Sequence, residues 1–235
     1  MKSKYSVGDT FKVPKGSTFV IEEYIKWDHV RVRSIDTGYT TITNTSLITK
    51  KAIKDLLAPE LCGIGIVGEK YKPKDHKDAY TKWSSILRKH INELDSYKNK
   101  GIVCCEEWFK FENFVDWYTA QYMVGGMDYD IDKDLKYIGN TVYSPETCWL
   151  IPTPINRWLT VSNISAHIEQ NKNGSIFRAR GTSCGCQYDR KFNCAEDARM
   201  FKIEQIKNNF LYLADKYREF ISDDIYNRLV HLSSS

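Results

Sequence analysis

The first fifty residues alternate between apolar and polar positions, as half-buried β-strands do. The alternation is strict over residues 30–33, and a turn signature follows at residues 36–39. Strands are predicted at residues 10–13, 18–24, 30–33 and 40–43. Short strands joined by tight turns indicate a small, barrel-like antiparallel sheet. Arg31 and Arg33 would share one face, either as phosphate contacts or, as we favour, as part of a solvated surface.

The middle of the chain has helical periodicity. Residues 76–97 and residues 105–122 each place apolar or aromatic side chains at three- and four-residue spacing, which predicts two helices. Their aromatic density is typical of core packing around a small sheet. The glycines of residues 63–68 fit a dinucleotide-binding pattern, but a charged run with Pro73 follows in place of an apolar helix. We therefore interpret the glycine run as a linker turn.

Residues 127–158 predict a compact ββα unit. A short apolar run ends at Asp132, a turn follows at residues 139–140, and a second apolar run covers residues 148–151. Prolines then open a predicted helix that carries Asn156, because proline suits a first helical turn. In such a unit an acidic residue at a strand end and an amide on the helix could meet. Oxygens of that kind can hold a divalent cation that stabilises charge at a phosphate.

The C-terminal part predicts a three-stranded sheet and a long helix. Its strands are expected at residues 164–169, 175–180 and 186–192. The helix is expected over residues 193–220, with Asn193 as its cap. Its apolar stripe needs cover, which the apolar residues of the middle strand would provide. Arg178 and Arg180 alternate with those residues and must then point away from the helix.

Composition limits the class of protein. With 235 residues, 42% hydrophobic and 27% charged, the chain is expected to be globular, with room for two or three modules. No apolar run approaches the length of a membrane span, and the first residues lack a signal-peptide core, so no membrane partner is expected. Seven cysteines form an odd set. We therefore expect free thiols in a reducing cytosol, without a disulfide framework or a zinc site.

The distribution of charge along the chain indicates more about binding partners than the net charge of +4 does. The ββα segment holds a cluster of acidic residues: Asp128, Asp130, Asp132 and Asp134. Such a cluster suits a cation site, and a solvated acidic hairpin is the alternative. Near the end of the chain, residues 172–191 carry five basic residues against one acidic residue, Asp189. This local charge favours DNA, and a charged sheet face without a partner is the alternative.

The ββα segment resembles the degenerate HNH nuclease module of bacteriophage homing endonucleases. The likeness rests on the order of Asp132, Asp134, the Gly-Asn pair at 139–140, the Tyr-Ser-Pro-Glu-Thr-Cys run at 143–148, and Asn156. Upstream, parts of residues 80–114 resemble the helix-rich lead-in of these phage proteins, so the likeness covers roughly residues 60–160.

This resemblance implies a catalytic group made of Asp132, Lys133, Asn140 and Asn156. Asp132 and Asn156 stand where the family has its metal ligands, which implies Mg²⁺ if the site is active and no cofactor otherwise. Lys133 replaces the His that activates the attacking water, and Thr147 replaces the central Asn. A protonated lysine cannot accept a proton from water, so the resemblance leaves open whether the chain is an enzyme.

The C-terminal pattern resembles the Apetala-type DNA-binding domain, which lays a three-stranded sheet in the major groove. On this resemblance Arg178 and Arg180 contact bases or phosphates. The residues that would flank them are Lys172, Gln187, Arg190 and Lys191. Arginine suits this role because its planar fork bonds two acceptors at once.

Together these observations predict an α+β protein of three modules, residues 1–60, 61–160 and 161–235. The expected function is sequence-specific binding of double-stranded DNA in the cytoplasm of a bacterial host, on a scaffold that resembles homing endonucleases, and metal-dependent phosphodiester cleavage by this scaffold is left open. The alternatives are a non-cleaving transcriptional repressor derived from such an enzyme and an interaction module whose sheet binds protein. The sequence shows no dimer seam and leaves the oligomeric state open, with a dimer as one option.

Overall fold

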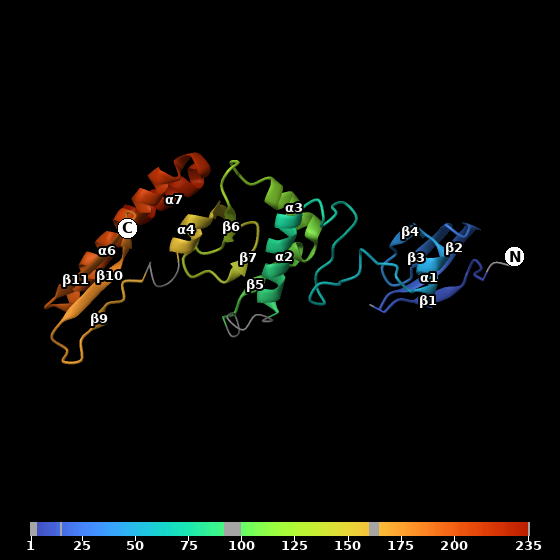
Figure 1. The fold of residues 1–235 in the computed structure, drawn as a ribbon, viewed down its shortest axis with the longest axis horizontal. Helices are drawn as coiled ribbons and strands as arrows, with labels where there is room; N and C mark the ends of the chain where they lie inside the picture. The colour runs from blue at the N-terminus through green and yellow to red at the C-terminus, as the bar shows by residue number, and fades with distance from the viewer. Residues whose placement is uncertain (1–3, 15, 92–99, 160–164, 235) are drawn as a thin grey trace. The chain divides into compact units, whose positions relative to one another are not determined.

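The structure is a computed structural model, and we describe all residues except 1–3, 15, 92–99, 160–164 and 235. The chain divides into two compact units, residues 1–119 and 120–235 (Figure 1). Both mix small antiparallel sheets with helices, which confirms the α+β class. In the described part of the chain, no helix combines the length and the apolar composition of a membrane span. The division into three modules stays a prediction.

The N-terminal sheet is a four-stranded antiparallel meander, and its strands confirm all four predicted segments. They are β1 (Thr10–Lys12), β2 (Thr18–Lys26), β3 (His29–Ser34) and β4 (Thr40–Thr43), followed by α1 (Thr45–Thr49). Alternate residues such as Phe19 and Val32 are fully buried. Arg31 and Arg33 lie on the other face, where they form ion pairs with Glu23 and Glu22 of β2 at 3.3 and 2.5 Å.

The first predicted helix of the middle segment is α2 (Lys77–His90), and the rest of its predicted span reaches residues outside the described part. The second predicted helix, residues 105–122, is wrong as a single helix. It consists of the 3-10 turn η2 (Glu106–Phe109) and α3 (Phe111–Thr119), with the short strand β5 (Val103–Cys104) before them. The break has a long-range cause. Ile66 donates its N–H to the Phe109 carbonyl and accepts the Phe111 N–H, each at 2.8 Å, so these groups cannot continue a helix.

The second unit begins with the predicted ββα order. Its elements are β6 (Tyr129–Asp132), β7 (Val142–Tyr143), β8 (Trp149–Pro152) and α4 (Thr153–Trp158). β6 and β8 pair antiparallel, with Asp132 opposite Trp149. Asp132 therefore lies at the end of a strand, and Asn156 lies on the helix that follows the partner strand.

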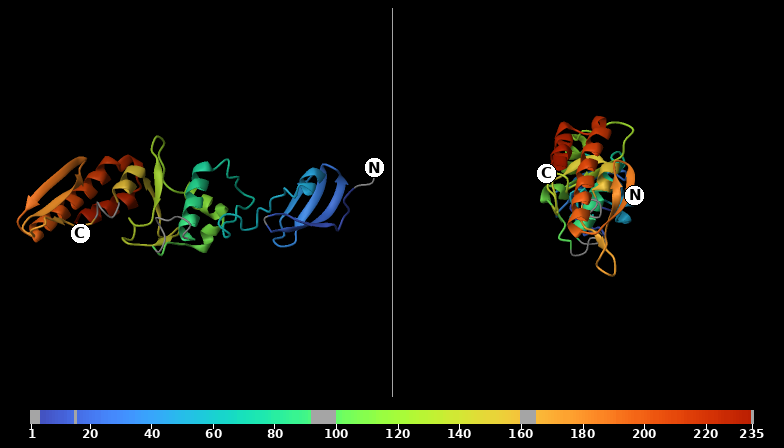
Figure 2. Two further views of the ribbon diagram at one scale, coloured as in Figure 1. Left: turned by 60° about the horizontal axis from the view of Figure 1, so that its bottom comes forward. Right: turned by 90° about the vertical axis from the view of Figure 1, so that its left-hand side faces the viewer.

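The C-terminal sheet has the order β11-β10-β9 and lies along a long helix (Figure 1 and Figure 2). Its elements are β9 (Glu169–Gln170), β10 (Phe177–Ser183), β11 (Cys186–Phe192) and α6 (Ala195–Lys216). The predicted strand over residues 164–169 is wrong for most of its described part, because Lys202 donates to the His167 carbonyl at 2.8 Å and His167 donates its N–H to Ser165 Oγ. The predicted cap is also wrong, since Cys194 occupies the cap position without a side-chain hydrogen bond.

A further helix, which the sequence analysis did not predict, joins the parts of the second unit. After η3 (Arg218–Phe220), α7 (Asp223–Ser234) runs beside α6. One apolar cluster combines residues of the ββα segment with residues of both C-terminal helices: Leu135, Ile151, Ile155, Leu159, Phe210, Ala214, Ile221, Ile225 and Leu229. Polar bonds cross the same boundary, because Arg228 donates to the Leu135 carbonyl at 2.9 Å and Tyr129 donates to the Phe220 carbonyl at 2.9 Å. The ββα segment and the C-terminal sheet therefore belong to one body.

Candidate nucleic-acid interface

The C-terminal sheet has one face against α6 and one face open. Ala179 and Ser183 of β10 are buried on the α6 side, so the residues that alternate with them lie on the other side. Cross-strand register places Glu169 and Lys191 opposite Arg178, and Asp189 opposite Arg180. We call this side the outer face, and its residues are Glu169, Arg178, Arg180, Thr182, Gln187, Asp189 and Lys191.

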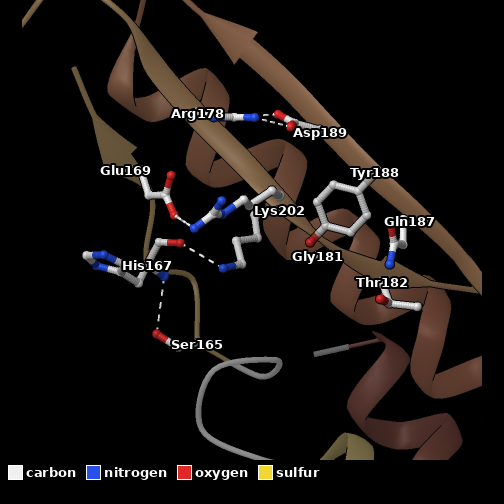
Figure 3. A pocket seen from close by; sticks show the side chains of 11 residues that line it. Ser165, His167, Glu169, Arg178, Gly181, Thr182, Gln187, Tyr188, Asp189 and Lys202 are labelled. Atoms are coloured by element: carbon white, nitrogen blue, oxygen red, sulfur yellow. Dashed lines mark hydrogen bonds and ion pairs between the residues drawn. The ribbon is translucent and has the colours of Figure 1, made fainter.

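Both predicted arginines lie on the outer face, and each forms an ion pair with an acidic residue of a neighbouring strand. Arg178 donates through Nε to Asp189 Oδ1 at 2.6 Å and through Nη2 to Asp189 Oδ2 (Figure 3). Arg180 Nη2 lies 2.5 Å from Glu169 Oε1. The pairing is diagonal, because each arginine binds the acid that stands opposite the other one. The hydrogen bonds to Asp189 raise the pKa of Arg178, and those from Arg178 lower the pKa of Asp189, so both remain charged.

The remaining predicted DNA contacts divide between the two faces. Gln187 and Lys191 lie on the outer face, and Lys172 is exposed in the turn between β9 and β10. Arg190 does not flank the arginines as we expected. It stands opposite Ala179, on the α6 side, with its guanidinium carbon 4.8 Å from the centre of the Phe201 ring. Successive residues of a strand point to opposite faces. Asp189 and Lys191 therefore lie on the outer face, and Arg190 between them does not.

A depression of about 990 Å³ covers much of the outer face, including Arg178 and Asp189, and extends past the edge of β10 (Figure 3). Ser165, His167, Glu169, Arg180, Thr182 and Lys202 are among its lining residues. Lys202 comes from α6 and is only 7% exposed. Burial lowers the pKa of its ammonium, and Arg180 lowers it further, while Glu169 acts in the opposite direction. Lys202 was not among the predicted DNA contacts, although its spacing of four residues from Ala198 places a cation on the buried stripe of the helix.

The acidic candidate site lies at the end of β6. Asp132 is 6% exposed, and its Oδ1 accepts the backbone N–H groups of Asp134 and Leu135 at 3.1 and 2.6 Å. Burial raises the pKa of Asp132 to about 6, with the charge of Asp134 adding to the rise and the two N–H bonds opposing it. A buried carboxylate of this kind carries a desolvation cost that a bound cation would reduce.

The amide of Asn156 contacts a different carboxylate from the one we expected. Its Nδ2 donates to Asp130 Oδ2 at 3.2 Å. Asp130 and Asp132 are two residues apart on β6 and so share a side of the strand. The oxygens of these residues are of the type that Mg²⁺ prefers. In the described residues, no group of three His, Cys, Asp or Glu side chains is arranged to hold a metal. The Mg²⁺ site at Asp132 and Asn156 stays a prediction.

Lys133 and Asn140 hold the loop that follows β6. Lys133 Nζ donates to both carboxylate oxygens of Asp134 at 2.8 Å and to the Asn140 carbonyl at 2.5 Å. The Asn140 amide donates to the carbonyls of Lys133 and Val142 at 3.0 and 2.7 Å, and its oxygen accepts the Val142 N–H at 3.0 Å. All of these contacts lie within the loop, so Lys133 and Asn140 act here as structural residues that fix its shape.

Comparisons with protein-family models, with curated proteins and with solved structures give no match. The likeness to phage HNH modules and to the Apetala-type domain rests on the quoted residues.

Proposed function

We propose that this protein binds double-stranded DNA through the outer face of the β9–β11 sheet. The observation that carries the proposal is the pair of guanidinium groups of Arg178 and Arg180 on the open side of a sheet whose other side is buried. Residues two apart on a strand are separated by about 6.8 Å, which is close to two base-pair steps of duplex DNA. Each fork can bind two acceptors on a guanine edge or on a phosphate.

The hairpin of β10 and β11 is a two-stranded antiparallel ribbon, an element that the major groove of DNA admits. Its turn consists of Cys184 and Gly185, both with positive φ, at 51° and 79°. The structure fixes this end of the hairpin to α6. Ser183 Oγ donates to the Gln205 carbonyl at 2.8 Å, and Cys184 N donates to Asn209 Oδ1 at 2.7 Å. A ribbon held in this way would lose little freedom on binding, which favours affinity.

The acidic partners affect how such a surface would recognise DNA. Glu169 and Asp189 offset most of the charge of Arg178, Arg180 and Lys191 on the outer face. Long-range attraction to any duplex is then weak, and each arginine must exchange a carboxylate for a base edge or a phosphate. This exchange favours sites that offer two well-placed acceptors, and so favours sequence selectivity over general adhesion to DNA.

Replacing Arg178 and Arg180 together by Ala is expected to weaken binding of a selected duplex at least tenfold, because two bidentate donors are lost. The duplex is first selected from a random pool with the wild-type protein, and affinity is measured by fluorescence anisotropy at fixed salt. Two single variants serve as controls. Arg199→Ala removes an exposed, ion-paired arginine of α6, and Arg190→Ala removes the arginine on the α6 side of the same hairpin. Equal affinity of the double variant and wild type would contradict the proposal.

DNA cleavage is a second candidate function, favoured by the oxygen donors of Asp130, Asp132 and Asn156 on a ββα unit. A cation held there would stabilise negative charge at a phosphate. The ammonium of Lys133 donates to Asp134. The proton of the attacking water would therefore have to go to another group. Carboxylates of the same site are the available acceptors.

If the site cleaves, the selected duplex in a supercoiled plasmid is expected to be nicked in Mg²⁺ or Mn²⁺ and left intact in EDTA. Asp132→Asn is expected to abolish the nicks while leaving duplex affinity unchanged, because Asp132 lies apart from the outer face. Binding without nicks in any divalent metal would instead support the non-cleaving repressor. A gel that separates supercoiled from nicked plasmid gives both readouts.

A further inference from the structure

We propose that the depression at the edge of β10 binds one phosphate of the DNA backbone, with the ammonium of Lys202 as its anchor and Arg180 as a second donor. This inference rests on the proposed function. It adds a phosphate site that shares Arg180 with the outer face and extends from that face past the edge of β10 to Lys202.

The first observation is the unusual environment of Lys202. Its side chain leaves the buried side of α6 and passes the edge of β10, and its ammonium donates to the His167 carbonyl at 2.8 Å (Figure 3). That acceptor is neutral, and none of the ion pairs among the described residues includes Lys202. A largely buried ammonium is costly unless an anion compensates it. An anion that entered the depression would supply the missing charge.

The second observation is the set of groups that share this depression. Arg180 is 60% exposed at its rim, and the hydroxyl groups of Ser165 and Thr182 line it. The ammonium of Lys202, the guanidinium of Arg180 and these two hydroxyl groups are suited to the tetrahedral oxygens of a phosphate, while the carboxylates of Glu169 and Asp189 also line the concavity. A backbone phosphate protrudes from the duplex and can enter the concavity.

Glu169 opposes an anion at this place, so removing its charge and removing the charge of Lys202 are expected to change phosphate binding in opposite directions. Its carboxylate lines the same depression and pairs with Arg180 at 2.5 Å. Removing the charge of Lys202 should weaken the phosphate contact. Removing the charge of Glu169 should strengthen it, because Arg180 then loses the carboxylate with which it forms its ion pair.

The test compares the salt dependence of duplex binding for full-length Lys202→Gln and wild type. Gln keeps a donor for the His167 carbonyl and loses the charge. Losing one phosphate contact is expected to reduce the slope of log affinity against log salt concentration by about 0.9. Affinity is expected to fall by the same factor for the selected duplex and for a random-sequence duplex, because a phosphate carries no sequence information. Glu169→Gln is expected to raise both affinities.

Lys207→Gln is the matched control, since Lys207 lies on the same helix and lines a different depression with Asp197 and Glu204. Its slope is expected to equal that of wild type. Lys202→Met removes both the charge and the donor to His167. If Lys202 only holds the backbone at His167, Lys202→Met will lower the unfolding temperature, and neither Lys202→Gln nor Lys202→Met will change the salt slope of binding. That result would overturn the inference.

A second experiment uses inorganic phosphate and does not depend on DNA. Millimolar phosphate is titrated into the full chain while the amide signals of Thr182 and His167 are followed by NMR. Shifts in wild type that disappear in Lys202→Gln support the site even if no duplex binds, in which case only the DNA proposal fails. An unchanged slope in Lys202→Gln together with no phosphate-dependent shift in wild type would overturn the inference while leaving DNA binding by the outer face intact.

Discussion

Asp132→Asn is expected to stabilise the metal-free protein at pH 7 by about 3 kcal/mol. Burial raises the pKa of Asp132 from 3.8 to about 6, and each unit of pKa difference between the folded and unfolded states corresponds to about 1.4 kcal/mol. Asn cannot ionise, and its side-chain oxygen can still accept the N–H groups of Asp134 and Leu135. The variant therefore avoids the cost of a buried charge and keeps the hydrogen bonds that fix the end of β6.

The sign of this effect follows from proton binding. Between pH 3.8 and about 6 the folded state holds a proton on Asp132 that the unfolded state has released. The stability associated with this group is therefore complete below pH 3.8, falls as the pH rises, and is lost above about pH 6. The gain from Asp132→Asn should be small at pH 4 and largest at pH 7.

Urea unfolding in EDTA at several pH values between 4 and 7 measures this gain. Asp128→Asn is the control, because Asp128 is an exposed carboxylate on the same segment, and a surface substitution of this kind usually changes stability by less than about 0.5 kcal/mol. A variant at position 132 that is less stable than wild type at pH 7 would show that the hydrogen bonds to the carboxylate outweigh its burial. The same titration with Mg²⁺ present tests the cation site, since a metal that binds Asp132 should stabilise wild type and not the variant.

Strand periodicity predicted the faces of the C-terminal sheet, because a side-chain period of two depends only on local geometry. Arg178 and Arg180 lie on the outer face as that period requires. The position of Arg190 follows from the same rule, and the expectation failed because it grouped basic residues by their nearness in the sequence. The ion pairs with Glu169 and Asp189 depend on cross-strand register. Register is set by the hairpin turns and the buried face together, so it could not be derived from charge alone.

Contacts between distant segments account for the other differences. The helix predicted over residues 105–122 is broken because Ile66 bonds the backbone on both sides of Lys110, and no local signal near Lys110 indicates this. The strand predicted over residues 164–169 is absent at residues 165–168, where Lys202 donates to the His167 carbonyl, and it is present at Glu169. In contrast, α7 was detectable, since Ile225 and Leu229 are four residues apart and two acidic residues open the helix.

The shared core makes α7 the element on which the rest of the second unit depends. Leu229 is fully buried in the cluster that includes Leu135 of the ββα segment and Phe210 of α6. Leu229→Ala is expected to lower the free energy of unfolding by about 2–5 kcal/mol, because it removes buried apolar atoms and leaves a cavity. Since one cluster serves both parts, the ββα segment and the C-terminal sheet are expected to lose stability together.

Hydrogen exchange followed by NMR measures the stability of the ββα segment and of the C-terminal sheet separately. Amide protection is compared between β8 and β10 in Leu229→Ala and wild type, and both strands are expected to lose protection by a similar factor. Leu211→Ala is the matched control, because Leu211 is 44% exposed on α6 and its truncation should change protection little. Loss of protection in β8 alone would mean that the two parts unfold independently. Equal loss would mean that the two parts unfold as one cooperative unit, as their shared apolar cluster predicts.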